Sequence, residues 1–189
     1  MLLRHATSLA CAILLTVGPA LAQLEPGSMP ETSAPQAAPA KPSPPATATV
    51  SLNGKNITIH YSAPSMRGRK IMGELVPFDK VWRTGANEAT TFVTDANLRI
   101  GSATVPAGSY TLYTLPGASQ WQLIINKQTG QWGTVYNQDQ DLVRVPMKGS
   151  TLPSPQEKMS ISFENTSGNS TVLHIRWENT DQFVPIAAQ

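Results

Sequence analysis

The sequence has 189 residues, of which 14% are charged, and its 14 Lys and Arg against 12 Asp and Glu give a formal net charge of +2. This balance lacks the concentrated positive field that nucleic acid or an acidic membrane surface requires, so neither is an expected partner. A single cysteine excludes an internal disulfide, and the fold must rely on its hydrophobic core.

The N-terminal segment, residues 1–22, has the pattern of a secretory signal peptide. Arg4 and His5 supply a positive end, an apolar run extends from Leu9 to Val17, and Ala20-Leu21-Ala22 fits a small-residue cleavage site. The apolar run is short for a bilayer span, although a retained anchor is the alternative. We expect export to the periplasm or the extracellular space, a mature chain that begins at Gln23, and no integral membrane span after cleavage.

A segment dominated by Pro and Ala follows at residues 23–46. This composition buries little apolar surface and favours extended polyproline conformations. We interpret it as a disordered linker, dispensable for folding, that is either a tether or a tolerated tail. All twelve aromatic residues lie at or beyond Tyr61, so one folded domain is expected at residues 47–189.

A β-hairpin is expected at the start of this domain. Asn53-Gly54 is a two-residue turn signal between two segments of alternating polarity. Pairing around the turn places Val50 opposite Ile57 and Ala48 opposite Ile59. One face of the hairpin is then apolar and the other polar, as a half-buried antiparallel pair requires.

Further short strands, separated by turn signals, are expected up to the C-terminus. They lie at 90–95, 98–100, 103–105, 109–115, 121–127, 142–148, 159–165 and 171–179. Only residues 70–75 have a weak helical pattern. About nine short strands predict an all-β, antiparallel β-sandwich similar to a jelly roll. A closed barrel is the alternative, because residues 121–127 are apolar on both faces.

The long segment at residues 63–89 follows neither a strand pattern nor a helix pattern. A loop of this length is uncommon in a compact domain and indicates function or disorder. Disorder is disfavoured because the segment contains large apolar side chains, namely Ile71, Leu75, Val76, Phe78, Val81 and Trp82. We therefore expect it to fold back over the sandwich as a cap.

A basic turn opens this cap, with Arg67, Arg69 and Lys70 around a glycine. Arginine presents a planar fork to carboxylate or phosphate, and glycine lets a ligand approach the backbone amides. The turn is therefore a candidate ligand site. A solvated surface turn is the alternative interpretation.

The end of the cap has the sequence VWRTGANE. Trp82 offers a flat surface for stacking, while Arg83, Asn87 and Glu88 offer hydrogen-bond donors and acceptors. In the alternative interpretation Trp82 fills the core, and Arg83 and Glu88 form an internal ion pair. Under both interpretations, Arg83 and Glu88 are not both free surface charges.

A third candidate is the loop from 131 to 136, which contains Trp132 and Tyr136. An exposed aromatic pair in a loop suits a carbohydrate or a peptide. The alternative is a tryptophan folded over the edge of the sheet.

Signals for metal binding and nucleophilic catalysis are weak. His60 and His174 both lie within expected strands, and the sequence has no H-x-H, H-E-x-x-H or G-x-S-x-G spacing. We therefore expect no metal site and no cofactor.

Four stretches of the chain resemble a bacterial family known as domain of unknown function 2911. They are YSAPSMRGRKIMGELVPFDKVWRTGANEATTF, VPAGSYTLYTLPG, WQLIINKQTGQWG and RWENTDQFVPI. The resemblance extends from about Thr47 to Ile186 and implies an exported, β-rich envelope protein. It implies no activity, substrate or catalytic residue. The residues that match the family's signature are Arg67, Gly68, Arg69, Trp82, Arg83, Gly85, Asn87 and Glu88.

Three functions are compatible with these patterns. The leading one is binding of a small or polymeric envelope ligand, anionic or sugar-like, under the 63–89 cap. The second is a hydrolase with Arg83 as charge stabiliser and a cap carboxylate, Glu74, Asp79 or Glu88. The third is a structural or interaction module. A binder requires a concave basic and aromatic surface, a hydrolase requires a carboxylate in a cleft beside Arg83, and a structural module requires internal partners for every polar group of the cap.

Overall fold

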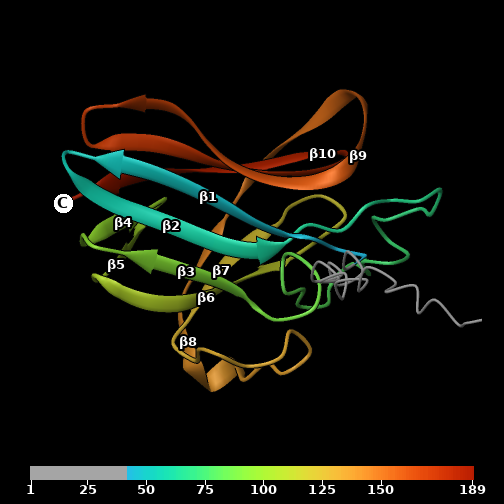
Figure 1. Cartoon of the computed structure of the whole chain (residues 1–189), viewed down its shortest axis with the longest axis horizontal. Helices are drawn as coiled ribbons and strands as arrows, with labels where there is room; N and C mark the ends of the chain where they lie inside the picture. The colour runs from blue at the N-terminus through green and yellow to red at the C-terminus, as the bar shows by residue number, and fades with distance from the viewer. Residues whose placement is uncertain (1–41) are drawn as a thin grey trace, which may run out of the picture. The chain divides into compact units, whose positions relative to one another are not determined.

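The computed structural model describes residues 42–189, and these residues form an all-β fold (Figure 1). The expected signal peptide and the linker up to residue 41 lie outside them. The elements are β1 Pro45–Leu52, β2 Lys55–Ser62, β3 Thr90–Thr94, β4 Leu98–Ile100, β5 Ala103–Val105, β6 Gly108–Leu115, β7 Gln122–Asn126, the 3-10 helix η1 Gln138–Gln140, β8 Asp141–Pro146, β9 Lys148–Ser167 and β10 Ser170–Ala188. Within this range no helix has the length and hydropathy needed to cross a membrane.

The strands form two antiparallel sheets, as predicted, and the sheets do not close into the alternative barrel. One sheet has the order β1-β2-β3-β6-β7-β8, and the other has the order β5-β4-β10-β9. Large apolar side chains from both sheets are at most 2% exposed, among them Leu52, Ile59, Phe92, Leu123 and Trp177. The alternating sequence pattern thus buries one face of each sheet in a shared core, which makes the fold a β-sandwich.

The first hairpin has the predicted register. Val50 lies opposite Ile57 and Ala48 opposite Ile59. However, β1 begins at Pro45, before the domain boundary expected at residue 47. The end of the Pro-rich segment therefore belongs to the folded part.

The two last strands, β9 and β10, are longer than predicted. The sequence indicated a strand only from residue 159 onward, because Pro153 and Pro155 argue against one. In the structure β9 lies at the edge of its sheet, where a residue without an N–H group is tolerated. Register shifts on both sides of Glu178 interrupt the pairing of β10 with β9. At this interruption β10 bends, so that residues before and after Glu178 are in contact. The rings of His174 and Phe183 stack with centroids 5.2 Å apart.

The residues between β2 and β3 form the predicted cap. Isolated bridges fasten it to both sheets, from Ser65 to Lys158 in β9 and from Trp82 to Thr114 in β6. The weak helical pattern at residues 70–75 was misleading, because this stretch forms turns and a single bridge.

Candidate ligand site under the cap

The backbone of the segment VWRTGANE is fixed by buried hydroxyl contacts around Thr84. The Thr84 hydroxyl lies 3.1 Å from that of Thr114, and the Thr84 carbonyl accepts a hydrogen bond of 3.0 Å from the Thr90 hydroxyl. Thr84 itself is fully buried. Much of this segment is therefore architectural, and the contacts fix the direction of the side chains on either side of Thr84.

Two residues of the segment have left-handed backbone conformations, Thr84 with φ 53° and Asn87 with φ 60°. For a β-branched residue such as threonine this conformation is strained, at about 1–2 kcal/mol. Backbone strain of this kind persists only where surrounding contacts enforce it, and it is concentrated at functional sites.

Four of the candidate residues line one cavity of about 310 Å³ under the cap, namely Arg69, Trp82, Arg83 and Asn87. The remaining walls come from Ser43, Pro64, Leu75, Val76, Gly85, Ala86 and Trp177. Two guanidinium groups and two indoles therefore surround the cavity, and its described lining contains no carboxylate. The sequence did not signal the contribution of Trp177, because its alternation marks it only as an inward-facing core residue.

Arg83 is half-buried, and its side chain has no hydrogen-bond or ion-pair partner within residues 42–189. Its Nε atom is buried without a hydrogen bond. The ion pairs of the described residues do not include Arg83, so the ion pair with Glu88 that the alternative interpretation required is not formed. Burial lowers the pKa of the Arg83 guanidinium, which nevertheless stays charged at neutral pH. A half-buried cation with an unsatisfied donor is a place where a bound anion would be stabilised.

Gly133 lets the loop after β7 pack directly against Arg83. An added Cβ at this position would lie 1.9 Å from Arg83 Cδ and 2.5 Å from the Asn87 carbonyl oxygen. The Gly133 N–H donates to that carbonyl at 3.1 Å. Gly133 therefore positions both cavity residues. Sequence patterns did not indicate this close approach, because a glycine in a loop is equally compatible with an open turn.

Trp82 packs in the core, as in the alternative interpretation, and it also lines the cavity. Its ring stacks on Trp177 with centroids 5.8 Å apart and planes 18° apart, and it meets Trp121 edge-on at 6.3 Å. These contacts anchor the cap to the core. The same indole forms part of the cavity lining, while one of its faces is covered by Trp177.

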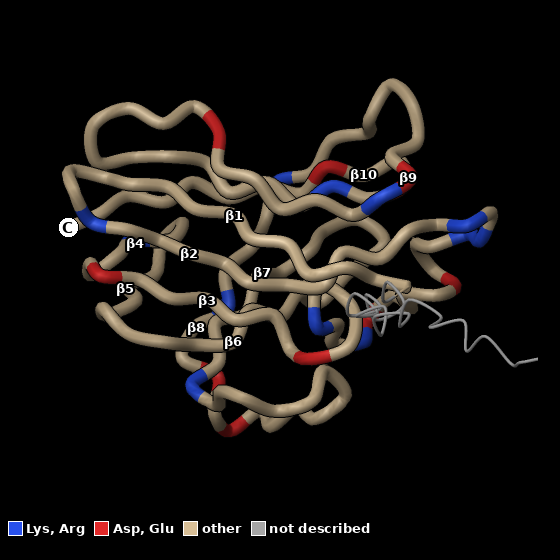
Figure 2. Tube along the Cα trace, in the orientation of Figure 1, with Lys and Arg blue, Asp and Glu red and all other residues tan. Residues whose placement is uncertain are grey.

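The three cations of the basic turn, Arg67, Arg69 and Lys70, do not point into one common cavity. Its charges lie on an exposed loop of the cap (Figure 2). The Arg69 guanidinium donates to carbonyls of its own turn at 2.8 and 2.9 Å, and Arg67 donates to the Pro42 carbonyl at 2.6 Å. Lys70 forms an exposed ion pair with Glu74 at 3.5 Å. Only Arg69 reaches the cavity.

Glu88, Trp132 and Tyr136 also lie outside the cavity lining. Trp132 is 53% exposed, and its backbone forms a bridge with Glu88. The Tyr136 hydroxyl donates to the Asp141 carboxylate at 2.6 Å and accepts from Arg144 at 2.6 Å. Burial and the bond to Asp141 raise the pKa of Tyr136 to about 12. The hydrogen-bonding capacity of Tyr136 is therefore used within the protein.

The two histidines within residues 42–189 lie in different sheets and do not meet. His60 is in β2, where its ring lies 3.1 Å from the Thr47 hydroxyl, and His174 is in β10, 2.9 Å from Asp181. Residues 42–189 contain no group of three or more His, Cys, Asp or Glu side chains arranged to hold a metal ion.

Fold and cavity together define the class of protein as a β-sandwich with a loop cap over a cationic, aromatic cavity. The chain belongs to the family described as protein of unknown function (DUF2911), whose sequence model matches residues 43–186. This match confirms the family resemblance. Comparison with curated proteins and with solved structures found no match.

Proposed function

We propose that the protein is an exported binding protein that holds a small anionic ligand in the cavity under the 63–89 cap. The observation that supports this function best is the state of Arg83. Its side chain lines the cavity, is half-buried, and has no carboxylate or carbonyl partner among the described residues. A carboxylate or phosphate group would accept the hydrogen bonds that Arg83 does not make inside the protein.

The other walls indicate what the rest of the ligand would meet. Arg69 adds a second positive charge, and Asn87 donates only a long bond of 3.4 Å to the Ser43 carbonyl. Trp82 and Trp177 provide apolar surface. A cavity of about 310 Å³ is at the lower end of the range for small-molecule sites, about 300–1,000 Å³. We therefore expect a small anion with an apolar or flat part, or one charged end group of an envelope polymer.

The described lining favours binding over the two alternatives. A hydrolase needs a carboxylate beside Arg83, and neither Glu74, Asp79 nor Glu88 lines this cavity. A purely structural cap needs an internal partner for each buried polar group, and the Nε atom of Arg83 has none.

Titration of the purified protein with acetate, benzoate and inorganic phosphate tests this function. Binding is measured by calorimetry and by tryptophan fluorescence, since two tryptophans form part of the cavity wall. We expect at least one of these anions to bind, and Arg83→Met to weaken binding about tenfold or more, because a charge-assisted hydrogen bond contributes about 1.5–3 kcal/mol. Lys70→Met removes a cap charge outside the cavity and should bind like the wild type. Equal binding by Arg83→Met, or no binding of any of the three anions, would contradict the proposal.

A further inference from the structure

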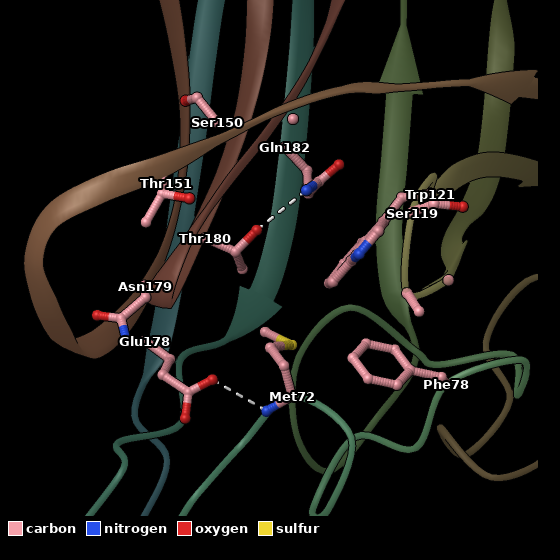
Figure 3. A pocket seen from close by; sticks show the side chains of 13 residues that line it. Met72, Phe78, Ser119, Trp121, Ser150, Thr151, Glu178, Asn179, Thr180 and Gln182 are labelled. Carbon is pink, nitrogen blue, oxygen red and sulfur yellow. Dashed lines mark hydrogen bonds between the residues drawn. The ribbon is translucent and has the colours of Figure 1, made fainter.

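A second cavity, of about 360 Å³, lies between the cap and the interrupted part of the β9–β10 pair (Figure 3). Met72 and Phe78 line it from the cap, Trp121 from the segment before β7, and Thr180 and Gln182 from β10. Trp121 also meets Trp82 edge-on, so the tryptophan cluster contributes a wall to each of the two cavities.

The carboxylate of this second cavity is already hydrogen-bonded within the protein. Glu178 is the charged residue of its described lining. The Glu178 carboxylate accepts the N–H groups of Ile71 and Met72 at 3.0 and 3.1 Å, one on each oxygen (Figure 3 shows the bond to Met72). Both carboxylate oxygens therefore have hydrogen-bond partners within the protein, and the site does not require a cation from a ligand. The cavity therefore suits a neutral ligand.

Gln182 presents an unused polar group to this cavity. It is 8% exposed, and its amide nitrogen donates to the Thr180 hydroxyl at 3.0 Å. No described residue donates a hydrogen bond to its amide oxygen, and this oxygen is not among the buried atoms without a partner, so it is open to solvent and available as an acceptor. Gly149 makes this position possible, since an added Cβ there would lie 2.5 Å from Gln182 Nε2.

Apolar side chains face these polar groups. Phe78 is 38% exposed, and Figure 3 shows its ring, Met72 and Trp121 gathered on the side of the cavity toward the cap and β7. One side of the cavity thus carries hydroxyl and amide groups, which can donate and accept hydrogen bonds, and the opposite side is aromatic. A sugar ring matches this arrangement, because it has hydroxyl groups at its edges and an apolar C–H face.

We propose that this cavity is a second binding site, independent of Arg83, for a neutral carbohydrate of one or two rings. The Gln182 amide and the Thr180 hydroxyl contact sugar hydroxyls, and Phe78 packs on a ring face. Ser119, Ser150, Thr151 and Asn179 make no side-chain hydrogen bond with other described residues and extend the polar lining. The cavity volume of about 360 Å³ falls within the range for small-molecule sites, about 300–1,000 Å³.

The test is a titration of the purified protein with maltose, cellobiose and N,N′-diacetylchitobiose, followed by calorimetry and tryptophan fluorescence. Wild type should bind at least one of these disaccharides. Phe78→Ala and Gln182→Leu should each weaken binding about tenfold, because the first removes the ring that packs on the sugar and the second removes the amide that contacts its hydroxyls. Val135→Ala is the matched control, since Val135 is an exposed apolar residue, at 48%, outside both cavities. Phe78→Ala should fold normally because its ring is partly exposed, which keeps the test valid if Gln182→Leu is unstable.

The Arg83→Met variant separates this proposal from the anion site. It should lose anion binding and keep disaccharide binding. If none of the three disaccharides binds, or if Phe78→Ala and Val135→Ala bind equally well, the second site is wrong whatever the anion titration shows. Loss of disaccharide binding in Arg83→Met would place the sugar in the other cavity and would also overturn the proposal.

Discussion

Arg83 and Arg176 are both partly buried arginines, yet their surroundings differ completely. Arg176 donates to Asp181 from Nε at 2.9 Å and to Glu164 from Nη2 at 2.9 Å. The bonds to Glu164 and Asp181 raise the pKa of the Arg176 guanidinium against the opposing effect of burial. Arg83 has no comparable partner in the described part of the chain. Arg176 thus stabilises the fold, whereas Arg83 is available to a ligand.

Replacement of each arginine by methionine should therefore affect stability differently. Arg176→Met leaves Glu164 and Asp181 without their cation and should lower the free energy of unfolding by about 3 kcal/mol. Arg83→Met removes no internal bond and should change it by less than about 1 kcal/mol. Urea denaturation of both variants measures the two effects. A loss in Arg83→Met as large as that in Arg176→Met would mean that Arg83 is structural.

The sequence identified Arg83 and Asn87 as candidates because polar groups beside a glycine turn are unusual in an apolar segment. It could not show that the ion pair between Arg83 and Glu88 fails to form. The directions of these side chains depend on left-handed backbone at Thr84 and Asn87, and residue spacing alone does not reveal such conformations. The same limit explains why Arg67 and Lys70 appeared to belong with Arg69.

At the scale of elements, a charged cluster lies on β9 and β10 and should make the protein sensitive to acid. Hydrogen bonds from Arg176 lower the pKa of Glu164 from 4.5 to about 2, with smaller contributions from Ser162 and His174. A carboxylate whose pKa is lowered by folding stabilises the protein fully above about pH 4.5, and this stabilisation is lost as the pH falls toward 2.

Urea denaturation at pH 5, 4 and 3 measures this loss, and Glu164→Gln provides the comparison. The variant should be less stable than the wild type at pH 5, and the difference should shrink as the pH falls. A constant difference between the two proteins across this range would show that Glu164 does not titrate as described.

Glu178 links the β10 bulge to the cap and offers a second test at this scale. Its carboxylate accepts the N–H groups of Ile71 and Met72, and its own backbone is left-handed with φ 54°. Glu178→Gln replaces one acceptor oxygen by a donor, so one of these amides loses its partner, at a cost of about 1–3 kcal/mol. Hydrogen exchange should become faster at Ile71 and Met72, while the amide of Val50 in β1 serves as a control. Unchanged exchange at all three positions would contradict this role.

A strand could be predicted from the sequence where neighbouring residues alone determine it, and not where its position in the whole sheet decides. The β1–β2 hairpin could be predicted residue by residue, because a two-residue turn fixes its register. The first half of β9 could not, because Pro153 and Pro155 are compatible with a strand only at a sheet edge, and edge position is a property of the whole sheet.

For the whole molecule, the structure moves the boundary of the folded part toward the N-terminus. Pro45 pairs with Ser62, the Pro44 carbonyl accepts from the Ala63 N–H at 2.9 Å, and the Ser43 carbonyl accepts from Asn87 at 3.4 Å. Amino-acid composition could not locate this boundary, because the contacts of residues 43–45 are made by backbone atoms and do not require particular side chains.

Two truncated chains test the boundary. A chain that begins at Pro42 should keep the melting temperature within a few degrees, because the preceding residues have the composition of a segment without a core. A chain that begins at Thr47 should melt at least several degrees lower, because it loses the pairing and carbonyl contacts of residues 43–46. Equal melting temperatures for the two chains would show that these contacts do not contribute.

The central claim is that the guanidinium of Arg83 is the anion-binding group under the cap. The most direct measurement is the Hε–Nε signal of Arg83 in NMR spectra of the isotope-labelled protein, assigned by its absence in Arg83→Met. Addition of acetate, benzoate or phosphate should shift this signal in a saturable manner, and the signal of Arg99, which lies outside the cavity lining, should stay in place. If the Arg83 signal does not move with any of these anions, or moves no more than that of Arg99, then Arg83 is not the binding group.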